Sequence, residues 1–310
     1  MRAVVFAYSN VGDRCLRVLR ARGLEVPLVV THRDAAGEAI WFRRVADTAR
    51  DLGLRVVYGD DPSDPGLRAA VEAARPDLIF SFYFRSLLPA PILAAAPRGA
   101  FNMHGSLLPR YRGRAPVNWA VLHDERETGA TLHEMVARAD AGRIVDQQAV
   151  PILPDDTARE VFDKVTVAAE QVLWRSLPAI LAGQVAYRAN ELAQGSYFGA
   201  RRPEDGRIDW SRPAREVYAL IRAVAPPFPG AFTEIAGRRV VIGSARMARA
   251  AASTGPASPG LRVDDGRVVA LCGDGGAIEV RELLADGVPL PAHALRALLD
   301  SDQRQQGNSR

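Results

Sequence analysis

The sequence predicts a doubly wound α/β fold, a Rossmann-like parallel sheet, with a C-terminal OB-like β-barrel domain. In the N-terminal half, short and continuously apolar segments alternate with amphipathic helical segments, which is typical of strands buried on both faces of a parallel sheet. Beyond residue 204, short β-like segments are separated by glycine turns at even spacing, which is typical of a small β-barrel. The chain has 310 residues, which is enough for both domains.

Five strands are expected in the N-terminal sheet, and each is a short apolar run such as AVVFAY. They are expected at residues 3–8, 26–32, 54–59, 77–84 and 99–105. Helices are expected between them, one ending near residue 21 and one over residues 38–52. A third begins after Asp64, an N-cap residue type, with Pro65 at its first position.

Downstream of residue 116 the pattern predicts two more strands, over residues 128–136 and 143–152, joined by the turn ADAG. A long amphipathic helix follows over residues 155–183, with acidic residues in its first turn. The periodicity then weakens, so we place a linker from about residue 184. The expected organisation is an α/β domain with this linker (1–203), an OB-like domain (204–300) and a disordered tail (301–310).

The composition, with 48% hydrophobic and 25% charged residues, is that of a water-soluble globular protein. No apolar run approaches the roughly 20 residues of a membrane-spanning helix, and the N-terminus lacks the pattern of a signal peptide. Two cysteines, Cys15 and Cys272, lie far apart, so we expect no disulfide framework and a cytoplasmic location. The net charge is +4, but Lys164 is the only lysine and arginines are interspersed with acids, so nucleic acid is not the expected partner.

Three common motifs are missing from the sequence. The turn after the first strand, AYSNVGDRC, has one glycine instead of G-x-G-x-x-G, which removes the main support for NAD binding. The P-loop pattern and the G-x-S-x-G nucleophile elbow are also absent. His123 and His133, with Asp124 and Glu134, do not have the spacing of a metal site, so no metal is expected.

The predicted strand GAFNMHG has polar side chains near its end. Asn102 and His104 are two residues apart, so they project from one face of the strand, while Phe101 and Met103 point into the core. An amide can donate a hydrogen bond to an oxygen that gains negative charge, and an imidazole can accept or deliver a proton near neutral pH. The alternative is a core histidine beside a turn-forming asparagine, and we favour the catalytic interpretation.

A catalytic histidine needs an orienting partner, and Asp140 in RADAGRIV is our candidate. The alternative interpretation is that Asp140 is an ordinary aspartate of a turn. The segment PRYRGRAP is expected to form a loop over the site. There Arg110, Arg112 and Arg114 either hold an anion or a flat ligand, or simply face solvent.

The stretches FNMHGSLLPRYRGRAPVNWA and ETGATLHEMVARADAGRIV strongly resemble the folate-dependent formyltransferases. The resemblance implies that the N-terminal domain is catalytic and that an acceptor amine attacks the formyl carbon of 10-formyltetrahydrofolate. It implies that Asn102 stabilises the tetrahedral oxyanion, that His104 shuttles the proton, and that Asp140 holds the imidazole.

Further segments, including VVFAYSNVG, SYFGARRPEDGRIDW and RAVAPPFPGAF, resemble the branch of this family that formylates UDP-4-amino-4-deoxy-L-arabinose for lipid A modification, which confers polymyxin resistance. The acceptor implied is therefore a nucleotide-linked 4-aminosugar. Position 86 is serine where the branch suggests a bulkier histidine. The folate contacts implied by the resemblance are Ser86, Leu87, Leu88, Arg114, Val136, Ala137, Arg138 and Ala139.

Three alternatives stay open on the sequence. Methionyl-tRNA formyltransferase shares the three catalytic residues, although the stretch after the second strand here is short and nearly balanced in charge. A hydrolase that releases formate and a non-catalytic binding protein are the others. Bifunctional members of the branch also carry an NAD-dependent decarboxylase domain, for which this chain has no room, so either the chain is a stand-alone formyltransferase or the decarboxylase is a separate polypeptide.

Overall fold

The computed structural model describes residues 1–35, 37–248 and 258–307. The chain divides into two compact units. The first contains Met1–Val117, Glu127–Pro151 and Val161–Ala200, and the second contains Asn118–Arg126, Ile152–Glu160 and Arg201–Arg310. The second unit therefore includes two short segments that precede the expected linker in the sequence.

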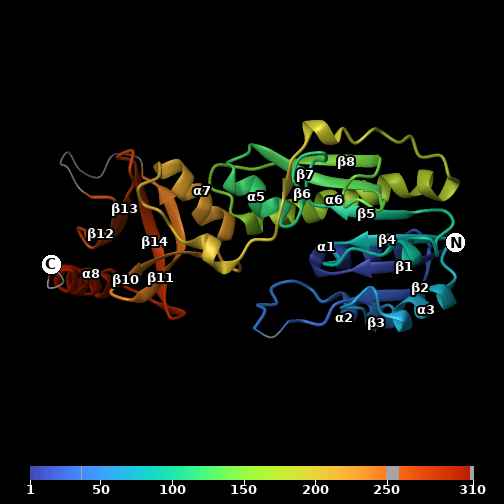
Figure 1. Ribbon diagram of the computed structural model, residues 1–310, viewed down its shortest axis with the longest axis horizontal. Helices are drawn as coiled ribbons and strands as arrows, with labels where there is room; N and C mark the ends of the chain where they lie inside the picture. The colour runs from blue at the N-terminus through green and yellow to red at the C-terminus, as the bar shows by residue number, and fades with distance from the viewer. Residues whose placement is uncertain (36, 249–257, 308–310) are drawn as a thin grey trace. The chain divides into compact units, whose positions relative to one another are not determined.

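The first unit is built on a seven-stranded sheet with the order β3-β2-β1-β4-β5-β7-β8 (Figure 1). Its parallel strands are β1 (Arg2–Ala7), β2 (Glu25–Thr31), β3 (Val56–Tyr58), β4 (Leu78–Phe82) and β5 (Ala100–His104). The last two strands, β7 (Glu127–Glu134) and β8 (Ile144–Pro151), are antiparallel. The chain winds outward from β1 in both directions, which confirms the predicted doubly wound fold.

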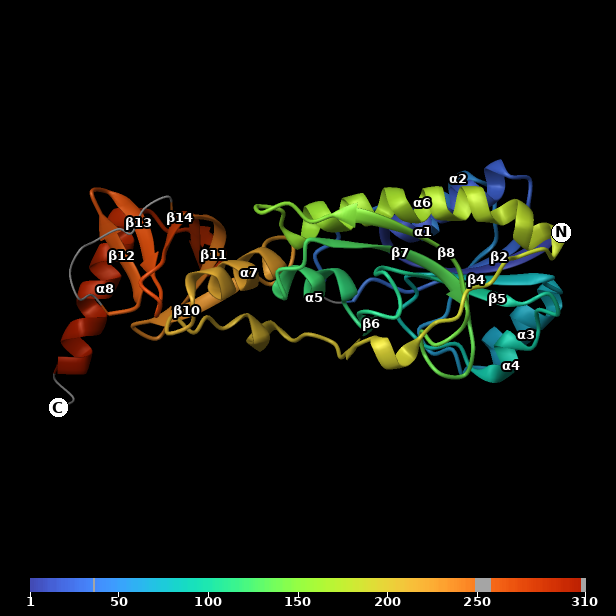
Figure 2. The same ribbon diagram turned by 90° about the horizontal axis from the view of Figure 1, so that it is seen from above.

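Helices cover both faces of this sheet. Figure 2 shows α1 and α6 on one side of the strands and α3 and α4 on the other. The helices are α1 (Ser9–Ala21), α2 (Val45–Asp51), α3 (Pro65–Ala74), α4 (Ala90–Leu93) and α6 (Ala158–Ala182). Helix α5 (Pro116–Leu122) belongs mostly to the second unit. None of the helices in the described part of the chain is long and apolar enough to cross a membrane.

The helix expected over residues 38–52 begins only at Val45. The preceding segment is an extended loop that ion pairs fasten to its surroundings. Arg44 Nε lies 2.6 Å from Asp34 Oδ2, and Glu38 pairs with Arg85 at the end of β4. These ion pairs compete with local helix formation, and apolar spacing alone does not reveal them.

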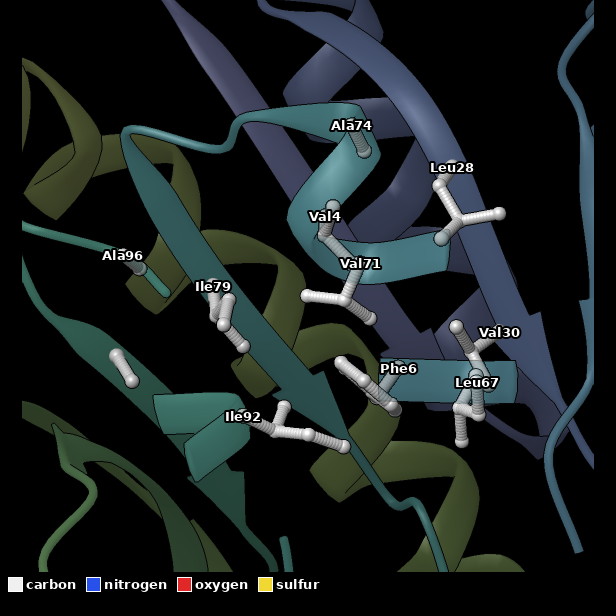
Figure 3. Packing of buried hydrophobic residues seen from close by; sticks show 11 residues of the cluster. Val4, Phe6, Leu28, Val30, Leu67, Val71, Ala74, Ile79, Ile92 and Ala96 are labelled. Carbon is white, nitrogen blue, oxygen red and sulfur yellow. The ribbon is translucent and has the colours of Figure 1, made fainter. Parts of the chain in front are cut away.

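Along the strands, one face of the sheet changes from apolar to polar side chains. The register Val4–Ile79–Ala100 places these three residues on the same face, where they pack with Val71 of α3 and Ile92 of α4 (Figure 3). The alternate residues face the other way, as shown by the stacked rings of Phe80 and Phe101, whose centroids are 5.8 Å apart. Asn102 and His104 therefore continue the face of Ala100, where the apolar packing gives way to polar side chains.

Part of the expected linker is ordered and pairs with the loop that follows β5. Two short strands, β6 (Arg112–Gly113) and β9 (Tyr197–Phe198), pair in parallel, and the Tyr111 amide donates to Ser196 Oγ at 2.9 Å. Gly113 has φ +97°, and a Cβ there would lie 2.2 Å from the Phe198 carbonyl oxygen. A glycine is required at this position, because the two backbones approach so closely.

The second unit contains a curled antiparallel sheet with the order β10-β11-β14-β13-β12, and β15 pairs with β14. Its form agrees with the predicted OB-like domain. The strands are β10 (Ala231–Ile235), β11 (Arg238–Met247), β12 (Gly260–Asp264), β13 (Arg267–Leu271), β14 (Ala277–Ala285) and β15 (Val288–Pro289). Short 3-10 turns occur at Leu192–Gln194 and Pro203–Gly206.

Two helices of this second unit were not expected, α7 (Ala214–Val224) and α8 (Ala292–Gly307). Helix α8 continues to Gly307, so residues 301–307 are helical where a disordered tail was expected. Residues 308–310 of the expected tail lie outside the described residues. Leu295 on α8 is fully buried, which shows that tertiary packing helps to hold a helix that the polar sequence after it does not suggest.

The N-cap predicted at α3 is present, since Asp64 Oδ1 accepts a hydrogen bond of 2.8 Å from the Gly66 amide. We expect Asp64→Ala to lower the free energy of unfolding by about 1 kcal/mol, because a first-turn amide loses its acceptor. Urea denaturation followed by circular dichroism measures the change. Asp64→Asn keeps a capping oxygen and is the matched control, so equal losses in both variants would contradict the capping role.

Candidate active site

The antiparallel pairing of β5 with β7 gathers four polar side chains on one face of the sheet. Asn102 pairs with His133, and His104 pairs with Thr131, so all four residues share that face. His104 and His133 are buried. Phe101 and Met103 lie on the opposite face, in the core, as the alternation predicted.

Asp140 reaches this face from the loop between β7 and β8. Its backbone has φ +50°, a left-handed conformation that aspartate tolerates better than most residues. The loop is fixed at both ends: the Met135 amide donates to the Ala100 carbonyl at 2.8 Å, and Asn190 Nδ2 donates to the Asp140 carbonyl at 3.0 Å. The position of the carboxylate is therefore set by neighbouring backbone.

The Asp140 carboxylate lies between two imidazoles. Its Oδ1 is 3.6 Å from His104 Nδ1 and 3.6 Å from His133 Nε2, and its Oδ2 accepts a 2.9 Å hydrogen bond from the Gly113 amide. Burial by itself raises the pKa of Asp140, but its polar neighbours, chiefly His104, outweigh burial and hold that pKa well below its ordinary value. The carboxylate is therefore ionised throughout the neutral range.

His104 is oriented by the loop that follows β5. Its Nε2 lies 2.8 Å from the Tyr111 carbonyl oxygen, and because a carbonyl only accepts, Nε2 carries a hydrogen and donates it. The loop is itself braced, since Thr131 Oγ1 donates to the Ser106 carbonyl at 2.6 Å and accepts from the Leu108 amide at 3.1 Å. Nδ1 is left facing Asp140, so a protonated ring donates toward an acceptor on each side.

His133 was considered in the sequence only as a metal ligand, and it is a member of this cluster. It is 2% exposed, and its Nε2 lies 3.1 Å from Asn102 Nδ2. The register between β5 and β7 would have revealed it, but a single sequence does not specify that register. Within the described part of the chain, no group of three or more His, Cys, Asp or Glu side chains is arranged to hold a metal ion.

The residues expected to contact folate lie on two loops. Both loops are beside the apolar cluster, by which we mean the buried side chains that pack around Val4, Ile79 and Ala100. Ser86, Leu87 and Leu88 follow β4, and Leu88 packs against the cluster together with Met135. Residues 136–139 lead directly to Asp140. Leu87 is 74% exposed and Val136 is 46% exposed, so each loop presents an apolar side chain to solvent.

The remaining residues of the expected folate set, Ala137, Ala139, Arg138 and Arg114, are partly or fully exposed. The Arg114 amide donates to the Phe198 carbonyl at 2.9 Å, which fixes its backbone beside β9. The arginines of PRYRGRAP do not act as one group, because Arg112 is buried while Arg110 and Arg114 are exposed.

A separate cavity of about 310 Å³ lies near the carboxyl ends of β1, β2 and β3, where Tyr8, His32 and Tyr58 contribute to its wall. The three arginines that line it are ion-paired with aspartates: Arg33 with Asp60, Arg44 with Asp34, and Arg50 with Asp47. The cavity contains none of the cluster around Asp140.

The fold and the cluster together define a class of protein. Asn102 supplies an amide donor, His104 supplies an imidazole, and Asp140 supplies an ionised carboxylate on one face of a doubly wound sheet. An amide donor stabilises an oxyanion, and an imidazole held by a carboxylate moves a proton. This is an α/β enzyme equipped for acyl-group transfer.

The comparison with protein families identifies the class more closely. The family described as "Formyl transferase" matches residues 1–177, and "Formyl transferase, C-terminal domain" matches residues 201–297. The chain belongs to the formyl transferase family, and it is a formyltransferase. The family expected from the sequence is thereby confirmed.

Solved structures share the fold at low sequence identity. An N-formyltransferase from Helicobacter canadensis, in complex with folinic acid and dTDP-3-aminofucose, has a TM-score of 0.72 and 19% identity over 90% of this chain and 98% of its own. The sugar 3N-formyltransferase WlaRD, with dTDP and 5-N-formyl-THF, has a TM-score of 0.71 and 18% identity over 91% and 97%. HypX from Aquifex aeolicus, with tetrahydrofolic acid, has a TM-score of 0.66 and 19% identity over 95% of this chain and 46% of its own.

The close approach of β6 and β9 can be tested at Gly113. We expect Gly113→Ala to lower formyl transfer at least about tenfold, because the new methyl group displaces Phe198 and moves the amide that binds Asp140. Gly53→Ala is the matched control, since Gly53 also has positive φ but open space around it. Equal turnover in the two variants would show that the close contact does not position the site.

The low pKa of Asp140 predicts a specific acid sensitivity. A depressed folded-state pKa contributes stability that is complete above the unfolded-state value of about 3.9 and is lost as pH falls toward the folded-state value. Between about pH 5 and about pH 2, wild type should therefore lose on the order of 2 kcal/mol more unfolding free energy than Asp140→Asn. Urea titrations across this range measure both curves, and parallel curves would contradict the assignment.

Proposed function

We propose that this formyltransferase moves the formyl group of 10-formyltetrahydrofolate to the amine of a nucleotide-linked aminosugar. The observation that carries the proposal is the convergence of Asn102, His104 and Asp140, three residues from two segments of the chain, in one cluster. The first candidate acceptor is UDP-4-amino-4-deoxy-L-arabinose.

The proposed reaction begins when the acceptor nitrogen attacks the formyl carbon. A C–N bond forms, and the carbonyl π electrons move to oxygen, where an N–H of Asn102 donates to the developing oxyanion. The attacking nitrogen gives its proton to His104 Nδ1, the ring nitrogen that does not donate to the Tyr111 carbonyl. The oxyanion then reforms the carbonyl, the bond from carbon to the folate nitrogen breaks, and His104 returns the proton to that nitrogen.

Asp140 stabilises the charge that His104 carries between these two proton transfers. Its carboxylate is ionised and lies 3.6 Å from His104 Nδ1, on the side away from the Tyr111 carbonyl. The ring cannot turn without giving up one of these two acceptors, so its orientation is fixed as well as its charge.

We assign the folate to the loops on either side of the apolar cluster. Leu87 and Val136 present apolar surface of the kind that a pterin or aminobenzoyl ring covers, and the exposed Arg114 and Arg138 suit its carboxylates. Ser86, Leu88, Ala137 and Ala139 complete the proposed contacts. Folate derivatives in three structures of similar fold support a folate co-substrate.

The acceptor class is supported by two of those structures, which contain dTDP-3-aminofucose and dTDP. The choice of UDP-4-amino-4-deoxy-L-arabinose as the acceptor rests on the sequence resemblance. A separate decarboxylase partner for the supply of this sugar stays a prediction.

An acceptor screen tests the proposal. Purified protein and 10-formyltetrahydrofolate are incubated with UDP-4-amino-4-deoxy-L-arabinose, with dTDP-3-aminofucose, or with charged initiator tRNA. Mass spectrometry detects formylated product, and absorbance follows tetrahydrofolate release. We expect transfer to the UDP sugar. Transfer to the dTDP sugar alone would change the acceptor within the class, whereas transfer to tRNA alone, or release of formate without an acceptor, would overturn the proposal.

The proton-transfer role of His104 makes a quantitative prediction. We expect His104→Ala to lower kcat on the order of a hundredfold or more, the usual contribution of general acid–base catalysis. His293→Ala, on the exposed face of α8, is the control and should retain turnover. Full activity of His104→Ala would remove this residue from the chemistry.

A further inference from the structure

His133 makes two hydrogen-bonding contacts that specify its protonation state. Its Nδ1 lies 2.7 Å from the Glu134 carbonyl oxygen, and a carbonyl only accepts, so Nδ1 carries a hydrogen. Its Nε2 lies 3.1 Å from Asn102 Nδ2, and an amide nitrogen only donates, so Nε2 must accept. Both contacts are satisfied only by the neutral ring with its hydrogen on Nδ1.

This tautomer and the observed orientation of the Asn102 amide require each other. If the amide were turned over, its oxygen would face the lone pair of His133 Nε2, and neither atom would supply a hydrogen. The observed orientation uses one of the two N–H bonds of Asn102 for His133. The second N–H remains for another acceptor.

Asp140 is a charged neighbour of His133, and its Oδ1 is 3.6 Å from His133 Nε2. That separation is too long for a hydrogen bond. The Glu134 side chain is bound to Arg143, at 2.6 Å and 2.8 Å, and does not compete for the ring. A protonated His133 would direct its Nε2–H toward Asp140 and leave the Asn102 N–H without an acceptor.

We infer that His133 is a positioning residue: its neutral imidazole holds the Asn102 amide with one N–H bound and the other free for the oxyanion. The inference rests on the proposed function, in which Asn102 stabilises that oxyanion. His133 itself does not touch the reacting atoms. Its contribution to turnover passes through Asn102.

The tautomer can be measured without any substrate. In protein labelled with ¹⁵N-histidine, ring nitrogen shifts distinguish a protonated Nδ1 from a protonated Nε2, and His133→Gln assigns the signal. We expect the Nδ1–H form in the free wild-type enzyme at neutral pH. An Nε2–H form or a doubly protonated ring would overturn the inference.

Variants test the consequence for catalysis. His133→Phe keeps a ring but removes the acceptor, and we expect kcat to fall at least about tenfold with KM for both substrates within about twofold. His133→Gln offers an amide oxygen in place of Nε2 and should recover most of the loss. Thr128→Val is the matched control, because Thr128 is a buried residue of the same strand whose hydroxyl has no partner.

A double-mutant cycle separates positioning from general packing. In the Asn102→Ala background, His133→Phe should cause no further loss of kcat, because the group it positions is gone. An additive loss, unchanged kcat in His133→Phe, or equal losses in the Phe and Gln variants would overturn the inference. If wild type transfers no formyl group to any acceptor, the proposed function fails on its own, and the tautomer measurement still decides the contact.

Discussion

The largely buried Asp140 carboxylate is the constraint on which the arrangement of the first unit's functional face depends. A charge that leaves water must be compensated by partners in the protein, or the group becomes protonated. The compensation here comes from His104 on β5 and the Gly113 amide on β6. Two segments of the chain must therefore meet at one carboxylate, and each of them is fixed by its own backbone pairing.

The pairing partners extend this requirement well beyond the cluster. Strand β6 is held by β9, so the Gly113 amide is positioned by residues about 85 positions further along the chain. Asn190, in the same downstream stretch, holds the backbone of the Asp140 loop. A segment whose weak periodicity suggested a linker thus fixes both the carboxylate and one of its hydrogen-bond donors.

The sequence predicted the parts of this structure that depend on local pattern. Alternation along GAFNMHG placed Asn102 and His104 on one face, and the order of apolar runs predicted the doubly wound sheet. It missed what depends on pairing between distant segments. The antiparallel register that brings His133 beside Asn102 and the two-residue strands β6 and β9 have no periodic signature. The loop before α2 was predicted helical because apolar spacing does not reveal the ion pairs of Arg44 with Asp34 and of Glu38 with Arg85.

The charges of the cluster explain why a neutral His133 is compatible with proton transfer at His104. With His133 neutral and Asp140 ionised, the cluster carries one negative charge when His104 is neutral and none when His104 is protonated. In the proposed reaction, taking the proton from the attacking amine therefore removes a net buried charge, which favours that step. A permanently cationic His133 would cancel Asp140 in advance and oppose protonation of His104. In the proposed mechanism, His133 must therefore remain uncharged while it orients Asn102, so that Asp140 stays available to a protonated His104.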